Sequence, residues 1–388
     1  MHQYLLTTGR TLFRDLPFES VRRMQVDIEC RTAPGYDFCN PEREEDRILV
    51  IATSDQSGWT HVLSAREMSE AEMLAEWVRV VRERDPDIIE GHNIFNFDLP
   101  YLAARAARHG VPLAIGRDGG EPRRRNSRVS FGERALGYER FDVFGRHVDT
   151  YFLAQAYDIS HRTLSGFGLK EVAVHFGLAA PERTYVESAE IGAEFDRDPI
   201  RVEAYCRDDV IETRDLSRLL SRSNYLQTRM LPYAYQNVCV RGSATRIDAL
   251  MIREYLRQGH SLPIPGKPRA FAGGYTDMFV EGVVENVHHC DVRSLYPSLM
   301  LNHRIAPESD ELGVFLQLLA RLKNVRFDAK QRMSAATEPA ERNGYDALQS
   351  TFKILINSFY GYLGFSRARF GDFAAAEEVT RRGRDLLR

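Results

Sequence analysis

The sequence predicts an α/β layer fold for the first half of the chain. Residues 21–30 and 47–53 are short runs rich in apolar and β-branched side chains, which is typical of strands in a covered sheet. Between residues 69 and 81, apolar side chains recur at the spacing of a helix instead. Because strands that alternate with helices form a sheet covered by helices, we expect an α/β domain that ends near residue 222.

Cap and turn residues place the next elements. Ser69 and Glu72 form a capping box at the start of the first helix. Residues 87–90 form a short strand, and the helix after it has Pro100 in its first turn and Gly110 at its end. Two further helices are expected at residues 164–177 and 198–220.

Residues 116–142 are rich in glycine and arginine and include the run Arg123-Arg124-Arg125. We expect a solvated loop here, and the alternative is a direct contact with nucleic-acid phosphates. A net charge of −3 gives the whole chain no attraction to nucleic acid, but it does not exclude a local basic groove.

The second half of the chain is predicted to be mainly helical. Residues 224–259 have a helical pattern, and residues 311–361 form two helices joined by a polar turn near residues 338–344. Residues 282–290 mix β-branched and polar side chains, as a half-buried strand does. Residues 374–388 form a helical pattern without a stop signal, so we expect the chain to end inside a helix.

The composition, with 43% apolar and 28% charged residues, is that of an ordinary soluble globular protein. No apolar run reaches the roughly 20 residues that span a membrane, and the N-terminus lacks the apolar core of a signal peptide. We therefore expect a cytoplasmic protein. The cysteines are scattered without a C-x-x-C pair, which indicates free thiols and argues against a zinc or iron–sulfur site. They are Cys30, Cys39, Cys206, Cys239 and Cys290.

Four carboxylates and a tyrosine form the first candidate site. Asp27 and Glu29 lie on one face of the first strand, because strand side chains alternate. Asp98 stands at a strand-to-helix junction, and Tyr205 and Asp209 share a helix face at i and i+4. Hydrolysis of a phosphodiester by two metal ions about 4 Å apart needs several oxygen ligands and a group that orients the attacking water. Glu29 and the Tyr205 hydroxyl are the candidates for orienting that water.

Asp291 begins the second candidate site. It follows the predicted strand 282–290 and precedes Pro297, which suits the first turn of a helix. A carboxylate at such a corner can hold Mg²⁺ through oxygen. The alternative is that Asp291 caps the helix.

Two predicted helices carry side chains that suit a triphosphate. Arg326 and Lys330 stand one helical turn apart, where both could contact phosphates. The alternative interpretation is that they belong to a solvated helix face. Lys353, Asn357 and Tyr360 share a helix face at i, i+4 and i+7. Because Lys353 stands in an apolar helix, we expect it to have a partner.

Three segments resemble the exonuclease motifs of family B DNA polymerases: residues 26–29 (Val-Asp-Ile-Glu), residues 91–102 (Gly-His-Asn-Ile-Phe-Asn-Phe-Asp-Leu-Pro-Tyr-Leu) and residues 205–209 (Tyr-Cys-Arg-Asp-Asp). The resemblance implies a ribonuclease-H-like 3′–5′ exonuclease domain of the DEDDy type with two divalent ions, Mg²⁺ or Mn²⁺. Residues 145–149 and 164–170 resemble the segment between the motifs and are expected to be scaffold. The implied site residues are the metal ligands Asp27, Glu29, Asp98 and Asp209, the water-aligning Tyr205, and the site-shaping Asn93 and Phe97.

Three further segments resemble the polymerase part of the same family. Residues 291–298 are similar to motif A of the palm, residues 353–361 are similar to motif B of the fingers, and residues 271–274 are similar to a Tyr-x-Gly-Gly element with Phe in place of Tyr. The resemblance implies that Asp291 binds the catalytic metals and that Tyr296 excludes a 2′-hydroxyl. The residues implied to hold the nucleotide are Arg326, Lys330, Lys353 and Asn357, with Tyr360 near the nascent base pair.

The sequence departs from the family after Gly361, where no Tyr-x-Asp-Thr-Asp motif follows and the thumb is missing. We therefore expect no DNA polymerisation by this chain alone. It is expected to be a fragment of a polymerase, or one half of a split enzyme whose partner polypeptide supplies the missing motif and thumb. The predicted division is a short segment 1–20, the exonuclease domain 21–222, a partial palm 223–310, the fingers helices 311–365 and a truncated palm helix 366–388.

The leading hypothesis is therefore a family B DNA polymerase piece with a complete 3′–5′ exonuclease. Its DNA substrates are single-stranded 3′ ends and primer–template, and dNTPs are the substrates of polymerisation. The alternatives are a non-catalytic DNA-binding or assembly subunit and a stand-alone exonuclease. The complete exonuclease set argues against the former, and the intact segment 353–361 argues against the latter.

Overall fold

The computed structural model describes residues 2–131, 134–144, 146–180, 182–267, 269–271, 273–274, 276–289, 291–292 and 294–387. Gly145, Ala272, Cys290 and Arg293, which belong to the predictions made from the sequence, lie outside these residues. The chain divides into two compact units, each described here by itself. The sheet unit comprises Phe13–Tyr225 and Ala234–Val240, and the helical unit comprises Met1–Leu12, Leu226–Tyr233 and Arg241–Arg388.

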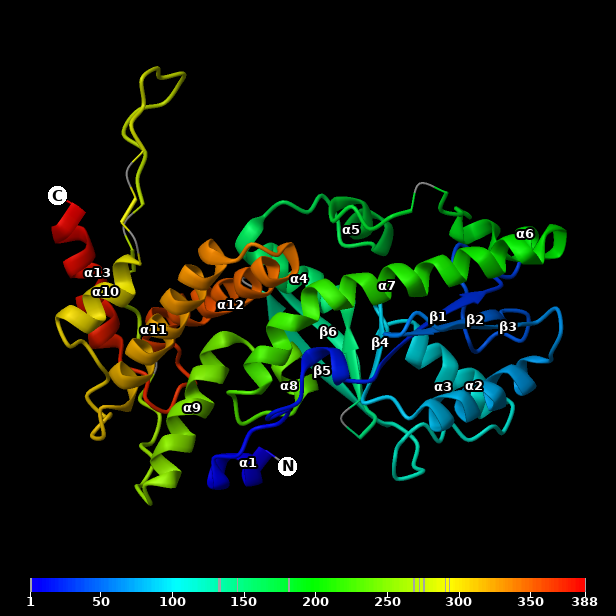
Figure 1. Cartoon of the computed structure of the whole chain (residues 1–388), viewed down its shortest axis with the longest axis horizontal. Helices are drawn as coiled ribbons and strands as arrows, with labels where there is room; N and C mark the ends of the chain where they lie inside the picture. Colours follow the sequence, from blue (N-terminus) through cyan, green and yellow to red (C-terminus); the bar gives the residue numbers. More distant parts are fainter. Residues whose placement is uncertain are drawn as a thin grey trace. The chain divides into compact units, whose positions relative to one another are not determined.

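A five-stranded mixed sheet forms the centre of the sheet unit, with the strand order β3-β2-β1-β4-β7 (Figure 1). β1 pairs antiparallel with β2 and parallel with β4, and β4 pairs parallel with β7. The three strands predicted for this unit are confirmed as β1, β2 and β4, whereas β3 and β7 were not predicted. The bounds are β1 Arg23–Cys30, β2 Ile48–Asp55, β3 Thr60–Ser64, β4 Ile88–Gly91 and β7 His147–Asp149.

Helices cover both faces of this sheet. α2 and α3 pack against the face that carries Val26 and Ile28 of β1, around the fully buried Trp77. α6 and α7 pack against β2 on the other face, through Phe195 and Cys206 among others (Figure 1). The bounds are α2 Glu70–Arg84, α3 Asp98–Arg108, α4 Thr150–His161, α5 Leu169–His175, α6 Ile191–Arg197, α7 Pro199–Thr228 and α8 Tyr235–Val240, with single 3₁₀ turns at Phe18–Ser20 and Ser188–Glu190.

The predicted helix signals are confirmed for α2 and α3. Ser69 and Glu72 form the capping box of α2, and Pro100 stands in the first turn of α3. α5 is shorter than predicted, because Gly168 has an extended backbone and is the N-cap. α7 is longer than predicted and carries the Tyr205–Asp209 segment in its first half.

The prediction of a solvated loop at residues 116–142 was wrong. Residues Arg123–Phe131 and Arg134–Asp142 form a two-stranded antiparallel hairpin, β5 and β6. Its arginines pair with acidic side chains of the opposite strand: Arg124 contacts Glu139 at 2.9 Å and Arg125 contacts Asp142 at 3.2 Å. Opposite charges across a strand pair stabilise a hairpin that composition alone does not reveal.

The helical unit is built from α1 His2–Thr8, α9 Ser243–Arg257, α10 Leu295–Asn302, α11 Val314–Ala335, α12 Pro339–Leu363 and α13 Phe373–Leu387. Its core includes Tyr255, Phe315, Phe359 and Val379. α11 and α12 are the two helices predicted within residues 311–361, but the turn between them comes earlier than predicted because Pro339 begins α12. None of the described helices has the length and apolar character needed to cross a bilayer.

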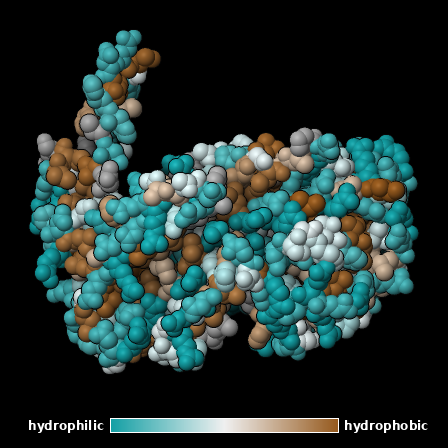
Figure 2. All heavy atoms as spheres, viewed as in Figure 1, coloured by the Kyte–Doolittle hydropathy of each residue, from teal (hydrophilic) through white to brown (hydrophobic). Residues whose placement is uncertain are grey.

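The predicted strand at residues 282–290 was also wrong. Residues 276–289, yellow in Figure 1, contain no strand, and their apolar side chains are exposed, with Phe279 at 84% and Val283 at 99%. Figure 2 shows the brown apolar atoms on this projecting segment. A lone strand is not stable without a partner strand, and the described part of the helical unit offers none.

Candidate active site

The four carboxylates of the first candidate site come together in the sheet unit. Asp27 and Glu29 lie on the face of β1 that is turned towards α7, because the alternate residues fill the core under α2 and α3. Asp98 is the first residue of α3, and Asp209 lies on α7, four residues after Tyr205. The structure therefore places the predicted set on three elements around one point.

The electrostatics show that these carboxylates are close to one another. Burial raises the pKa of the Asp27 carboxyl well above its usual range, and Asp209, Asp98 and Glu29 raise it further. Burial and Asp209 likewise raise the pKa of Glu29. The pKa values of Asp98 and Asp209 rise to about 8 and about 6, mainly through burial. Four acidic groups that oppose one another's ionisation suit cations, which would neutralise their charge.

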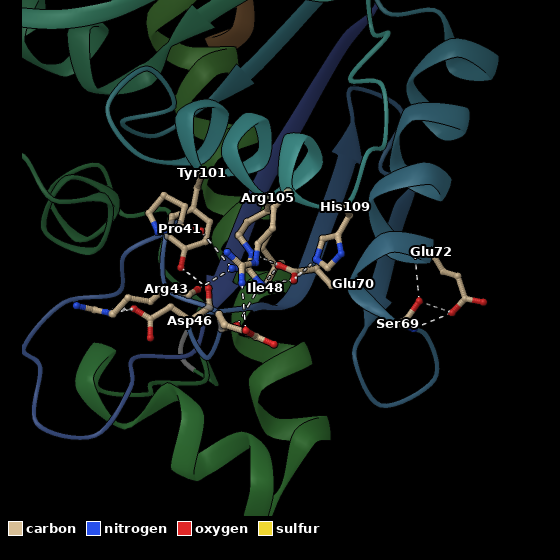
Figure 3. Close-up of polar contacts among 12 residues, drawn as sticks. Pro41, Arg43, Asp46, Ile48, Ser69, Glu70, Glu72, Tyr101, Arg105 and His109 are labelled. Atoms are coloured by element: carbon tan, nitrogen blue, oxygen red, sulfur yellow. Dashed lines mark hydrogen bonds and ion pairs between the residues drawn. The ribbon is translucent and has the colours of Figure 1, made fainter.

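A buried network holds α3, and with it Asp98. Arg105 of α3 donates from Nε to Oε1 of Glu70 at 2.7 Å and from Nη1 to the carbonyl oxygen of Arg43 at 2.7 Å (Figure 3). Tyr101 of α3 donates from its hydroxyl to the carbonyl oxygen of Asp46 at 2.6 Å (Figure 3). These contacts hold α3 against α2 and against the β1–β2 connection. They therefore also stabilise the position of Asp98, the first residue of α3.

Tyr205 and Asp209 have cationic partners that sequence reasoning missed. The Lys170 ammonium hydrogen-bonds to the Tyr205 hydroxyl, and Arg183 hydrogen-bonds to Asp209. Arg183 also donates from Nε to Oε1 of Glu212 at 2.5 Å. Lys170 was expected to be scaffold, and no local spacing relates either cation to its partner on α7.

Asn93 and Phe97, expected to shape the site, lie just before Asp98. Asn93 has a left-handed backbone with φ of 64°, and its N–H donates to Oδ1 of Asp149 at 2.8 Å. The Phe97 ring packs on Tyr101 with 5.5 Å between ring centroids. Asp149 also caps α4 by accepting from the N–H of Tyr151 at 2.7 Å, which agrees with the scaffold role predicted for its segment.

The residues present fit hard divalent cations. Their donors are carboxylate oxygens, the ligands that Mg²⁺ and Mn²⁺ prefer. Oδ1 of Asp98 is buried and has no hydrogen-bond partner in the described part of the chain, so it is available as a ligand. The mutual repulsion of the carboxylates is the charge that such cations neutralise.

Cys206 lies at this site, although the cysteine spacing argued against a zinc or iron–sulfur site. Its Sγ lies 3.5 Å from Oδ2 of Asp27. Among the described residues, Asp27, Glu29 and Cys206 form the group of metal-ligating side chains whose ligand atoms all lie within 4.8 Å of one another. The ligands come from β1 and α7, so their spacing in the sequence carries no signal. Cys30, Cys39, Cys206 and Cys239 are free thiols.

The second candidate site is only partly assembled in the helical unit. Tyr296 of α10 and Tyr360 of α12 pack together with 4.5 Å between ring centroids. Asp291 is exposed and belongs to no metal-ligating group in the described part of the chain. It does not cap α10 either, because the N-cap residue is Ser294. Pro297 stands in the first turn of α10, as predicted.

The predicted triphosphate ligands differ in their surroundings. Nη1 of Arg326 lies 3.5 Å from Oγ of Ser294, so this arginine faces the start of α10. Lys330 is exposed, which agrees with the solvated alternative. The expectation that Lys353 has a partner inside an apolar helix was wrong: Lys353 and Asn357 are both on the exposed side of α12, because the apolar side faces the core.

Two models of one family match the chain. The model "DNA polymerase family B, exonuclease domain" matches residues 12–172, which include Asp27, Glu29 and Asp98. The model "DNA polymerase family B" matches residues 303–388. The chain belongs to DNA polymerase family B. Tyr205, Asp209 and Asp291 lie outside both matched ranges, so their roles rest on the structure and on the motifs.

Curated proteins similar to this chain include archaeal DNA polymerases. A DNA polymerase of Pyrococcus glycovorans is 28% identical over 95% of this chain and 50% of its own length. A DNA polymerase of Archaeoglobus fulgidus is 29% identical over 96% of this chain and 48% of its own length. The chain thus spans about half the length of the curated relatives that it matches. The solved family B DNA polymerase of Pyrobaculum calidifontis shares the fold, with a TM-score of 0.73 and 24% identity over 95% of this chain and 50% of that one.

Proposed function

We propose that this family B chain is a metal-dependent 3′–5′ DNA exonuclease that removes nucleotides from single-stranded 3′ ends. The observation that carries the proposal is the meeting of Asp27, Glu29, Asp98 and Asp209 beside Tyr205, from three elements of one fold. The carboxylates repel one another without cations, and a phosphodiester substrate needs cations to neutralise its charge.

The side chains of this site have different roles in the proposed hydrolysis. Asp27, Glu29, Asp98 and Asp209 would hold two ions, Mg²⁺ or Mn²⁺, which supply an activated water and charge neutralisation at the scissile phosphate. Tyr205 orients the attacking water through its hydroxyl, and the Lys170 contact holds that hydroxyl in place. Burial raises the pKa of the Tyr205 phenol, so it remains a neutral donor at ordinary pH. The products are deoxynucleoside 5′-monophosphates.

Polymerisation is proposed as a second activity that this chain does not perform alone. Asp291 would bind the catalytic metals, and Tyr296, Tyr360 and Arg326 would contact the incoming dNTP, because they meet where α10, α11 and α12 approach one another. Lys330, Lys353 and Asn357 would reach the triphosphate from their exposed positions. A single exposed carboxylate is a poor site for two ions, so primer extension by the chain alone is expected to be undetectable.

Further polypeptide is proposed to complete the polymerase. The exposed apolar segment 276–289 has the composition of a strand but has no partner strand among the described residues, and it comes shortly before Asp291 in the sequence. A polypeptide that adds strands along this segment would bury its apolar side chains and bring new carboxylates to Asp291. The proposal includes the domain division predicted from the sequence: exonuclease domain 21–222, partial palm 223–310, fingers 311–365 and palm helix 366–388.

The test of the exonuclease assignment uses two labels on one single-stranded DNA. With Mn²⁺ or Mg²⁺, a 3′ label should appear at once as mononucleotide, while a 5′ label should shorten stepwise. Release of the 5′ label first, or no cleavage, would contradict the assignment. A non-catalytic DNA-binding subunit predicts that both labels stay on full-length DNA.

A further inference from the structure

Cys206 lies inside the carboxylate cluster rather than beside it. The side chain is fully buried on α7, and its Sγ lies 3.5 Å from both the carbonyl oxygen and Oδ2 of Asp27. With Glu29 it completes a group whose ligand atoms are all within 4.8 Å of one another. The Cys206 thiol therefore lies next to the Asp27 carboxylate of β1, within reach of a metal ion that binds this carboxylate.

The separation of sulfur and oxygen fits a single tetrahedral ion. With Zn–S of about 2.3 Å and Zn–O of about 2.0 Å, tetrahedral angles place sulfur and oxygen roughly 3.5 Å apart. The Cys206 Sγ to Asp27 Oδ2 distance is 3.5 Å. The pair thus needs almost no movement to bind one ion together.

A second, independent observation points to a bound ion. Asp98 is 1% exposed, and its Oδ1 has no hydrogen-bond partner in the part of the chain that the structure describes. Asp98 also contributes to the raised pKa of the Asp27 carboxyl, so the two carboxyl groups lie near each other. A buried polar atom without a partner is costly, and a ligand removes that cost. Asp98 therefore borders the site, and its carboxylate would have to move towards Asp27, Glu29 and Cys206 to join the ion, because its oxygens lie outside the group whose ligand atoms are all within 4.8 Å of one another.

We propose that Cys206 is a thiolate ligand through which the exonuclease site captures a thiophilic divalent cation of the Zn²⁺ class, and that this capture stops hydrolysis. Binding replaces the S–H proton, which passes to solvent, by a sulfur–metal bond. Mg²⁺ does not compete for sulfur, because it prefers oxygen ligands, whereas Zn²⁺, Co²⁺ and Cd²⁺ bind thiolate well. The captured ion occupies Asp27, which Mg²⁺-dependent hydrolysis also needs. This inference rests on the proposed exonuclease function.

The direct test is absorption spectroscopy with Co²⁺ alone and Cd²⁺ alone. A sulfur-to-metal charge-transfer band forms only when a thiolate is a ligand. The wild-type protein should show the band, and Cys206→Ser, which replaces the thiol by a hard oxygen, should lose it. Cys239→Ser is the matched control. Cys239 is also buried in the sheet unit, but its Sγ accepts a hydrogen bond from Asn224, and it belongs to no group of metal-ligating side chains among the described residues. A band that persists in Cys206→Ser, or no band in the wild-type protein, overturns the inference.

The second test measures Zn²⁺ inhibition of the exonuclease at fixed Mg²⁺. Removal of a metal-site contact typically changes metal affinity by about 10–100-fold, so Cys206→Ser should need at least about tenfold more Zn²⁺ for half inhibition than the wild type. Cys206→Ala, with a thermal unfolding curve, shows whether the sheet unit folds without the thiol. Equal inhibition of wild type and both variants contradicts the inference while the exonuclease assignment stands. A Cys206-dependent band in a protein without nuclease activity contradicts the proposed function but supports the metal site.

Discussion

Arg183 and Asp209 form a buried hydrogen-bonded ion pair in the middle of the carboxylate cluster. The Arg183 side chain is 1% exposed, and it bonds to Glu212 as well. Although burial raises the pKa of Asp209, the arginine opposes that rise. The pair thus keeps one predicted metal ligand oriented and available before any cation binds.

Arg183→Ala should destabilise the sheet unit and weaken its use of Mg²⁺. The change leaves two buried carboxylates without their partner, and the expected loss is about 3 kcal/mol in the free energy of unfolding. The Mg²⁺ concentration for half-maximal exonuclease activity should rise about tenfold. Urea unfolding followed by tryptophan fluorescence measures the first effect, because both tryptophans, Trp59 and Trp77, lie in the sheet unit.

Arg197→Ala is the matched control for that experiment. Arg197 also pairs with a glutamate, Glu194, but its side chain is 72% exposed. An exposed pair contributes about 0–1 kcal/mol, so little change is expected. Equal effects of the two substitutions would contradict the role given to Arg183.

The Arg105–Glu70 pair should hold α3 in place for Asp98. Arg105→Ala removes several hydrogen bonds of a buried side chain and leaves Glu70 with only the Ile48 N–H and His109 as partners, so a loss of about 3 kcal/mol is expected (Figure 3). Arg79→Ala, on the exposed side of α2, is the control and should cost less than about 1 kcal/mol. If Arg105→Ala unfolds at the same urea concentration as the control, this network does not fix α3.

The pH dependence of metal-free stability tests the burial of Asp98. Its carboxyl pKa is about 8 in the folded protein, against about 3.9 in an unfolded chain. The folded state therefore binds the proton more tightly, so the contribution of Asp98 is fully present below about pH 4 and is lost as pH rises through 8. In a chelator, Asp98→Asn should match the wild type at pH 4 and exceed it by on the order of 3 kcal/mol at pH 9.

Thermal unfolding by tryptophan fluorescence gives this comparison. Mg²⁺ or Mn²⁺ should raise the melting temperature of the wild type at pH 9 and should raise that of Asp98→Asn much less. If Asp98→Asn is less stable than the wild type in chelator at pH 9, the Asp98 carboxyl does not have the raised pKa on which this prediction depends.

Tyr205→Phe should lower the rate of hydrolysis without removing the metals. The change deletes only the hydroxyl that meets Lys170, and a positioned group of this kind contributes roughly 100-fold or more to a rate. We expect kcat to fall by about 100-fold, with Mn²⁺ affinity within about threefold of the wild type. A large loss of Mn²⁺ affinity with unchanged kcat would assign Tyr205 to the metal site instead.

Local patterns and the resemblance to family motifs together picked out the four carboxylates that the structure brings near one another. Strand alternation put Asp27 and Glu29 on one face, and helical spacing put Tyr205 and Asp209 on another, and both arrangements are confirmed. Arg183, Lys170 and Cys206 were not identified as parts of the site, because their contacts join elements that are distant in the sequence. Only folding makes them neighbours.

The errors in the fold have a similar cause. Residues 123–142 looked like a loop because arginine is frequent there, but each strand of the hairpin supplies the partner charges of the other. Residues 282–290 looked like a strand, but a strand forms only against a neighbouring strand, which the described part of the helical unit lacks. In both cases the outcome depends on partners that a local pattern does not contain.

Release of labelled mononucleotide from 3′-labelled single-stranded DNA, by wild type and Asp98→Ala side by side with Mg²⁺ or Mn²⁺, tests the central claim most directly. The account predicts release by the wild-type chain and a loss of at least about 100-fold in Asp98→Ala, because the substitution removes one of the proposed metal ligands. Intact DNA with both proteins, or equal degradation by both, would contradict it.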